Sequence, residues 1–292
     1  MTANGLEKSV DSSYHVGYID NDNGLVNFVA VKKYSLVEYR NFLEYRENIE
    51  NTVLQYMDLY RMVAVVHDNL IEAHSKHVDE VRLGKGISAR DDLVEINAHF
   101  AALIANFAMY LGCVPRKISS KNAKARGEHE KATHHEYDNS FAYKLFCVLR
   151  NYTLHNSPPI TGISGGSKIS KKNNKISVDY KIYIEKDKIL SDKKVRNKLR
   201  EDYDAFPDKY PVIKLAEDAI KSLKIIHWKT LKSLLISIQD EIALVESLVT
   251  LVPDGHPYVA EVISNKLTQE TDVRLELIPF DIIEIKKAAS KY

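Results

Sequence analysis

Apolar side chains recur at helical spacing in four long stretches of the chain, and this pattern limits the fold more than any other feature. In the first stretch, Leu43, Ile49, Val53 and Tyr56 lie near the spacing of one helix face. The four stretches span residues 35–80, 89–112, 137–155 and 212–251. They predict a mainly α-helical chain built around a four-helix bundle.

Shorter segments have the features of strands. Residues 14–34 predict two strands joined by a turn at Asp20–Gly24, and residues 176–190 alternate as a strand does. We expect a small accessory β-sheet, with terminal and inserted strands that could pair with one another. Residues 257–267 and 273–285 predict a short helix and a strand-like tail, and the polar stretch 116–135 predicts a loop with a short helix.

These elements predict three regions. Residues 1–34 form an N-terminal β-hairpin packed on the bundle. Residues 35–252 form the helical bundle, with a loop-and-strand insertion at 160–205, and residues 253–292 form a C-terminal helix and strand. Ser35, followed by Glu38 three residues later, predicts a capping box at the first helix.

Composition limits the class of protein. The formal net charge of +1 gives no global attraction to a polyanion, so any nucleic-acid binding must come from local basic patches. Only Cys113 and Cys147 are present, too few for a disulfide framework. The N-terminus lacks a basic segment followed by an apolar one, and no uninterrupted apolar run reaches roughly 18 residues. We therefore expect a cytoplasmic protein without a membrane partner.

The third helical stretch ends in Arg150-Asn151-Tyr152-Thr153-Leu154-His155, and Pro158 and Pro159 follow. Arginine can hold a phosphate through two hydrogen bonds, and histidine transfers protons near neutral pH. Asn151 precedes His155 by four residues, so the two share a helix face. Pro158 disfavours helical geometry at the preceding residue, which loosens the last turn near His155.

This string resembles the Arg-x4-6-His motif of HEPN-domain ribonucleases, including the polar residue after the arginine. The resemblance is specific over residues 137–160 and architectural over 36–250. It implies a HEPN-like four-helix bundle that pairs as a homodimer and cleaves RNA without metal or cofactor. It also implies a toxin or anti-phage role, with an antitoxin or regulatory protein as a further partner.

The implied reaction assigns a role to each residue of the motif. The RNA 2′-hydroxyl attacks the adjacent phosphate, leaving a 2′,3′-cyclic phosphate and a 5′-hydroxyl. His155 would remove the 2′ proton or protonate the leaving oxygen. Arg150 would stabilise the charge on the phosphate, and Asn151 would orient the phosphate or His155. Since this chemistry requires a 2′-hydroxyl, DNA should not be cleaved.

Several basic residues are candidates for RNA binding. Lys144 extends the polar face of Asn151, and Lys168, Lys171 and Lys172 lie in a loop that could follow an RNA backbone. The same loop could equally be a solvated linker. An arginine and a histidine at a helix end also interact favourably with its terminal carbonyls. A catalytically inactive HEPN-like RNA-binding or scaffold module is therefore the alternative.

The chain contains a second Arg–His pair and a cluster of histidines and glutamates. Arg61 and His67 have the same spacing, but they lie in an apolar context, which indicates packing. His129, His134 and His135 lie among glutamates in residues 128–138, which are types that ligate metals. The spacing of His129 and His134 is poor for two ligands on one helix, so a solvated segment is the preferred interpretation over a metal hydrolase.

Overall fold

The computed structural model describes residues 10–22, 25–83, 89–118, 122–155, 158–170, 175–252, 257–265, 268–269 and 271–292. Within these ranges, the side chains of residues 10, 21–22, 25–26, 89, 154–155, 166–170 and 175–179 are outside the description. The chain forms two compact units. The first unit combines Met1–Gln55 with Leu231–Tyr292, and the second unit is Tyr56–Thr230. The boundaries expected near residues 34 and 252 mark changes of secondary structure, whereas the unit borders lie at the start of one long helix and inside another.

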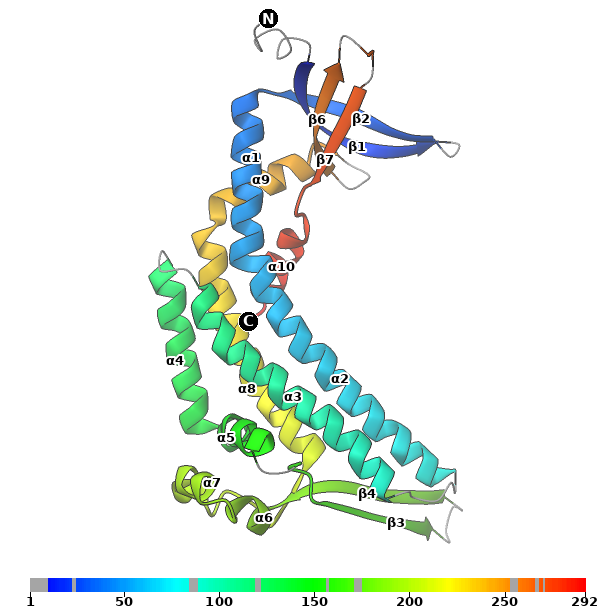
Figure 1. The fold of residues 1–292 in the computed structure, drawn as a ribbon, viewed down its shortest axis with the longest axis vertical. Coiled ribbons are helices and arrows are strands. Elements are labelled where there is room, and N and C mark those ends of the chain that lie inside the picture. The colour runs from blue at the N-terminus through cyan, green and yellow to red at the C-terminus, as the bar shows by residue number, and fades with distance from the viewer. Residues whose placement is uncertain are drawn as a thin grey trace, which may run out of the picture. The chain divides into compact units, whose positions relative to one another are not determined.

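The first unit contains a four-stranded antiparallel sheet in the order β2-β1-β6-β7 (Figure 1). Its strands are β1 (Val10–Asp22), β2 (Leu25–Tyr34), β6 (Pro257–Asn265) and β7 (Thr271–Leu277). The predicted N-terminal hairpin is confirmed, although Asn23 and Gly24 of its turn lie outside the described residues. The prediction of a helix over residues 257–267 is wrong, because Val259 and its neighbours form a strand that pairs with β1.

The described part of the first unit also contains helical segments. They are α1 (Leu36–Ile49), the π-helical η2 (Glu50–Leu54), the end of α8 (Val212–Ser237) from Leu231 on, α9 (Gln239–Val249) and α10 (Asp281–Ala289). The predicted capping box is present, since the Ser35 hydroxyl accepts from Glu38 N at 3.2 Å and Ser35 N donates to the Glu38 carboxylate at 2.7 Å. Tyr39 of α1 stacks on Tyr14 of β1 with ring centroids 4.4 Å apart, which fixes the helix on the sheet.

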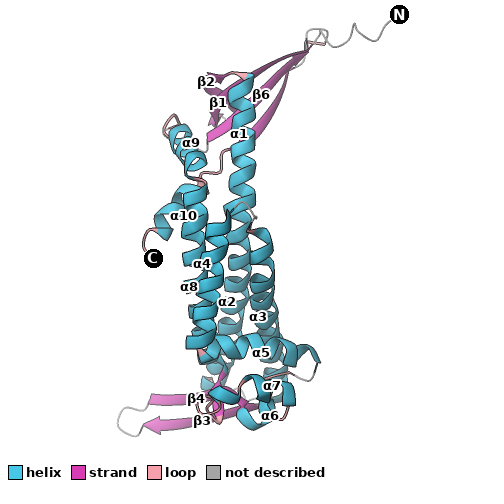
Figure 2. Cartoon of the chain, turned by 90° about the vertical axis from the view of Figure 1, so that its left-hand side faces the viewer, coloured by secondary structure: helices cyan, strands magenta, loops and turns pink. Residues whose placement is uncertain are grey.

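The second unit is built around long helices. These are α2 (Gln55–Arg82), α3 (Ala89–Lys117), α4 (Ala123–Asn139), α5 (Phe141–His155) and α8 (Val212–Ser237, up to Thr230 in this unit). Figures 1 and 2 show α2, α3, α4 and α8 side by side, with α5 lying across them. Phe100, Leu103 and Phe107 of α3 are fully buried, as the predicted apolar face requires. The mainly helical class is confirmed at this level of detail.

A second, three-stranded sheet lies in this unit, in the order β3-β4-β5. Its strands are β3 (Gly162–Ser170), β4 (Lys175–Glu185) and β5 (Lys209–Pro211). Short helices connect β4 to β5, namely α6 (Lys186–Leu190), α7 (Lys193–Lys198) and the 3-10 turn η4 (Arg200–Asp202). The single accessory sheet expected from terminal and inserted strands is therefore two sheets, because terminal strands pair only with one another.

The helix boundaries also differ from the prediction at several points. Residues 123–139 form a regular helix where a loop was expected, because the buried Ala125, His129, Ala132 and Glu136 give α4 an inner face. The helix expected over 137–155 is interrupted at Ser140, which has extended backbone angles. The polar composition of residues 123–139 did not indicate a helix of this length, which tertiary packing stabilises.

Candidate nucleic-acid interface at the end of α5

Helix α5 carries the Arg150–His155 segment at its C-terminal end. Before the helix, the Ser140 hydroxyl accepts a hydrogen bond from Tyr143 N at 3.3 Å, which satisfies one backbone donor of the first turn. Phe146 packs edge-on against Phe100 of α3, with centroids 5.5 Å apart. Figure 2 shows α5 lying across the other helices of this unit, where this packing helps to hold it.

Arg150 and Asn151 are both exposed, but they line different grooves. Arg150 lies with α3 residues around a groove of about 340 Å³, whereas Asn151 lies with α7 residues around a groove of about 550 Å³. Consecutive helix positions differ by roughly 100° in direction, which separates the two side chains. His155 is the last residue of α5, and its side chain lies outside the described side chains. Arg150 and Asn151 therefore do not converge on one groove within a single chain.

The groove beside Asn151 is bounded on its other side by α7. Asp192 caps this short helix, since its carboxylate accepts from Val195 N at 2.9 Å. Val195 is buried and anchors α7 against the unit. Lys193, Lys194 and Lys198 then face the groove that Asn151 lines. We call this cavity the α5–α7 groove.

The α7 side of the groove is strongly basic. Lys193, Lys194, Arg196 and Lys198 are all exposed, and none forms an ion pair with another residue in the part of the chain that the structure describes. Uncompensated surface cations attract phosphate groups and release counterions when they bind them. The near-neutral chain therefore has a local patch suited to a polyanion, which the sequence analysis did not single out.

Lys144, expected to bind RNA, is engaged elsewhere. Its ammonium group pairs with the Asp202 carboxylate at 2.5 Å and lies 5.4 Å from the centre of the Tyr137 ring. The adjacent Asp202 carboxylate raises the pKa of Lys144. The Lys144 side chain is only 14% exposed, so it contributes to the fold and is not part of the candidate RNA-binding surface. The side chain of Lys168, and all of Lys171 and Lys172, lie outside the description.

The histidines of residues 128–138 do not gather at one place. His129 is buried against Thr230, with Nδ1 3.2 Å from Thr230 Oγ1, whereas His134 and His135 are exposed on α4. Burial lowers the pKa of His129 to about 4. Among the described residues, no group of three or more histidine, cysteine, aspartate or glutamate side chains could hold a metal ion. The solvated segment expected here is instead part of helix α4, with His129 and Glu136 buried on its inner face.

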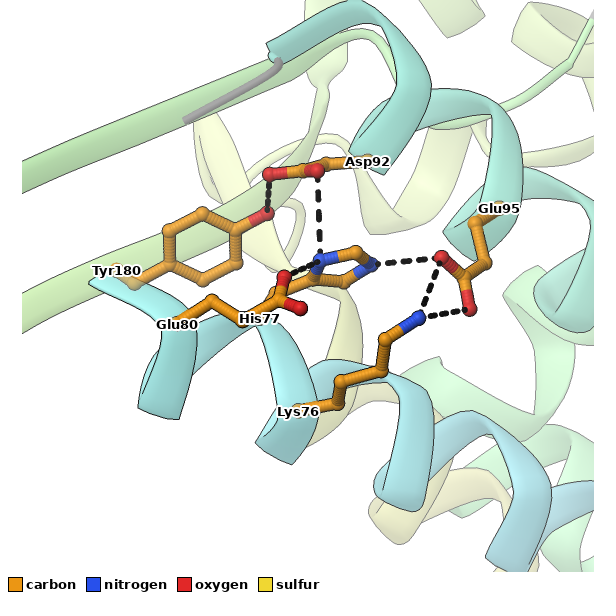
Figure 3. A network of polar contacts seen from close by, with 6 residues as sticks. All are labelled: Lys76, His77, Glu80, Asp92, Glu95 and Tyr180. Carbon is orange, nitrogen blue, oxygen red and sulfur yellow. Dashed lines mark hydrogen bonds and ion pairs between the residues drawn. The ribbon is translucent and has the colours of Figure 1, made fainter. Parts of the chain in front are cut away.

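A buried polar cluster that the sequence analysis missed joins α2 to α3 (Figure 3). His77 is only 3% exposed. Its Nδ1 lies 3.3 Å from Asp92 and 3.6 Å from Glu80, and its Nε2 lies 3.3 Å from Glu95. These are ion-pair distances, although neither ring nitrogen is aligned for a hydrogen bond. Carboxylates from both helices thus lie beside both ring nitrogens of His77, so a polar ring occupies this buried position between α2 and α3.

The same cluster ties β4 to the helices. The Tyr180 hydroxyl donates to the Asp92 carboxylate at 3.3 Å, and burial followed by the Asp92 charge raises the pKa of Tyr180. At the solvent edge, Lys76 Nζ lies 3.2 Å from Glu95. These contacts fix the start of α3 and the sheet beside it. Their partners lie far apart in sequence, so only the pairing of α2 with α3 could have indicated them.

A second buried histidine lies in the core between α2, α3 and α8. The His227 ring is stacked between those of Tyr56 and Tyr60, with centroids 4.8 and 4.0 Å away. Its Nδ1 lies 3.3 Å from the Tyr110 hydroxyl, and burial lowers the pKa of His227 to about 3. His227 is therefore neutral and structural.

By length and composition, Arg90–Lys117 of α3 is the one helix among the described residues that could cross a membrane, a criterion that core helices of water-soluble proteins also meet. Comparisons with known proteins found no matching family model, no matching curated protein and no matching solved structure.

Proposed function

We propose that the chain binds RNA in the α5–α7 groove and cleaves it, without a metal ion, through Arg150 and His155 at the end of α5. The observation that carries the proposal is the group of four exposed basic side chains on α7, beside a groove that also contains Asn151. The candidate catalytic string continues directly from that groove. In this proposal the unit is a HEPN-like helical bundle with inserted strands.

The chemistry of the groove favours the sugar–phosphate backbone over the bases. Lys193, Lys194 and Lys198 offer point charges for phosphate, and the Asn151 amide can donate and accept hydrogen bonds. Tyr152, the aromatic side chain in the lining, is only 6% exposed and offers little surface on which a base could stack. Recognition here should therefore tolerate many sequences.

The proposed reaction is an internal transfer at phosphorus. The 2′-hydroxyl oxygen forms a bond to phosphorus, the bond to the 5′-oxygen breaks, and the 2′ proton leaves as the 5′-oxygen gains one. His155 moves one of these protons, and Arg150 neutralises charge on the phosphate oxygens. Asn151 lies on the RNA-binding side, so the strand would pass over the end of α5 from the α7 side to the α3 side.

The division of Arg150 and Asn151 between two grooves favours a second candidate function. In that alternative, the unit is a catalytically inactive HEPN-like RNA-binding or scaffold module that uses only the α5–α7 groove. A toxin or anti-phage role and an antitoxin partner follow from the family resemblance and belong to the cleavage proposal alone.

One experiment separates the two functions. Purified full-length protein is incubated in EDTA with mixed RNA and with DNA of the same sequences, and binding and cleavage are measured in parallel. We expect RNA cleavage that survives EDTA, leaves 2′,3′-cyclic phosphate ends and spares DNA. Arg150→Ala and His155→Ala should each reduce the cleavage rate by at least about 100-fold while RNA binding persists.

The groove is tested by reversing its charges. Lys193→Glu, Lys194→Glu and Lys198→Glu combined should weaken RNA binding at least about tenfold. The matched control reverses three exposed lysines outside the groove, Lys124, Lys131 and Lys229. Equal losses in both triple variants would contradict the groove. Binding without cleavage by the wild type would favour the scaffold alternative, and cleavage that EDTA abolishes would overturn the mechanism.

A further inference from the structure

The two units carry opposite net charges, although the chain as a whole is close to neutral. Residues 1–55 and 231–292 of the first unit contain 11 lysines and arginines against 18 aspartates and glutamates, a formal charge of −7. Residues 56–230 of the second unit contain 30 basic against 22 acidic residues, a formal charge of +8. A surface with an excess of one sign attracts partners of the opposite sign. A partner of the first unit should therefore be basic.

Strand β7 forms one edge of the sheet in the first unit (Figure 1). It pairs with β6 on one side, and no strand in the described part of the chain pairs with its other side. Six of its seven residues are exposed. An edge of this kind presents a row of backbone donors and acceptors that can pair with a further strand.

The two edge strands of this sheet differ in how they oppose such pairing. The other edge strand, β2, carries Lys32 and Lys33, and its register with β1 shifts between Val16 and Gly17. Lysines and bulges are features that protect an edge from a further strand. β7 contains no lysine, proline or glycine, and its register with β6 runs without a shift. β7 is therefore the edge that can accept a strand.

β7 has an apolar face that points away from α1. Val273, Leu275 and Leu277 alternate along the strand and are 45%, 38% and 43% exposed. The charged residues between them face α1, since Glu276 pairs with Arg46 of that helix at 2.5 Å. Successive side chains of a strand point to opposite faces, so the three apolar side chains share the face away from α1. A strand added to β7 would bury its own alternate side chains against them.

The charged face of β7 offers one carboxylate to a partner. Arg274 lies 3.7 Å from Glu261 of β6, and Glu276 is paired with Arg46. Asp272 is exposed and forms no ion pair with another described residue. Opposite charges on neighbouring strands stabilise a sheet, so a basic side chain of an added strand can pair with Asp272.

We infer that the free edge of β7 binds an extended segment of a partner protein in which apolar and basic residues alternate. Main-chain hydrogen bonds to β7 would supply affinity, and the alternate side chains would supply specificity. The apolar side chains would meet Val273, Leu275 and Leu277, and the basic ones would lie on the face of Asp272. A second copy of the chain is disfavoured as the occupant, because it would bring two units of charge −7 together. This inference does not rest on the proposed function.

The first test uses a labelled heptapeptide in which lysine and valine alternate. Its binding to the full-length chain is measured by fluorescence polarisation in the absence of RNA. We expect saturable binding that is at least about tenfold weaker for two control peptides. One control has the same composition arranged as a block of lysines and a block of valines, and the other has glutamate in place of lysine. Equal binding of all three peptides, or binding of none, would overturn the inference.

Methylated versions of the alternating peptide test the backbone pairing. In a strand the lysine amides point to one edge and the valine amides to the other, and only one edge can pair with β7. N-methylation of the amides on the pairing edge should abolish binding, whereas N-methylation on the other edge should preserve it. Equal affinities of the two methylated peptides would contradict strand addition.

Substitutions in the chain locate the site. Leu275→Gln should weaken binding of the alternating lysine–valine peptide about tenfold, because it removes an apolar contact that binding buries. Val31→Gln, at an exposed valine of the other edge strand, should not weaken it. Asp272→Lys should weaken the lysine peptide and strengthen the glutamate peptide. Asp20→Lys, the same charge change at an exposed position of β1, should affect both much less.

Two results with these variants would overturn the inference. Equal effects of Asp272→Lys and Asp20→Lys would show that net charge alone attracts the peptide. Self-association of the chain that Leu275→Gln abolishes would identify a second copy as the occupant of the β7 edge. Sedimentation equilibrium without peptide measures this self-association.

Discussion

His77 shows how strongly the surroundings of one residue can differ from its sequence context. It continues the inner face of α2 after Leu70 and Ala73, where an apolar side chain would be usual. The structure instead surrounds it with carboxylates from α2 and α3. The His77 ring is thus a buried polar neighbour of Asp92, which is itself only 8% exposed.

The position of this ring predicts a measurable effect of a single substitution. His77→Leu should lower the free energy of unfolding by about 1–3 kcal/mol, because it removes the polar ring that lies beside the buried Asp92 carboxylate. Lys76→Met, at the adjacent exposed ion pair, should cost no more than about 1 kcal/mol. Urea unfolding followed by the fluorescence of Trp228, the single tryptophan, measures both. Equal costs for the two variants would show that the His77 ring contributes no more than an exposed ion pair does.

At the scale of secondary-structure elements, α5 and α7 together form a surface that neither forms alone. The apolar row of α5 was predicted from its spacing and is buried as expected. Helix α7, only six residues long, lies within the predicted 160–205 insertion, and its position opposite Asn151 was not predicted. The basic patch therefore results from the pairing of two elements about 40 residues apart in sequence.

This element pair predicts how RNA binding depends on salt. Each phosphate contact on a single strand changes the slope of log K against log salt concentration by about 0.7. Removing the charges of Lys193, Lys194 and Lys198 by substitution with glutamine should therefore flatten the slope by about two. Filter binding of a single-stranded RNA over a range of salt concentrations provides the measurement. An unchanged slope would place the RNA elsewhere on the chain.

At the scale of the whole molecule, buried histidines make stability depend on pH. Burial lowers the pKa of His227 to about 3 and of His129 to about 4, whereas both titrate near 6.5 in the unfolded chain. Below about pH 6.5 the unfolded chain binds protons that the folded chain excludes. The stabilisation is thus fully present above that pH and is lost as the pH falls toward 4.

We therefore expect the free energy of unfolding of the second unit to fall between about pH 6 and 4.5. In this range each buried histidine should contribute up to about 1.4 kcal/mol per pH unit to the slope of the free energy of unfolding against pH. His129→Gln should reduce the slope by that amount, and His134→Gln, at an exposed position of the same helix, should not. Urea unfolding at several pH values, monitored by Trp228, tests this. Identical slopes for the two variants would contradict the assignment.

Local patterns accounted for much of the secondary structure. The capping box at Ser35, the N-terminal hairpin and the apolar faces of α2, α3, α5 and α8 depend on neighbours within a few residues, so the sequence alone predicts them. The string from Arg150 to His155 could likewise be placed at a helix end, because Pro158 disfavours continuation of the helix. Residues 257–265 form a strand because β1 and β7 supply partners on both sides.

The sequence by itself thus determined the mainly helical class, the caps and the position of the Arg150–His155 string in its helix. Only the tertiary structure decided that terminal and inserted strands form separate sheets. It likewise decided that Lys144 is paired with Asp202 and that α7 lies opposite Asn151. Helix periodicity shows which residues share a face, but partners distant in the sequence decide what each face meets.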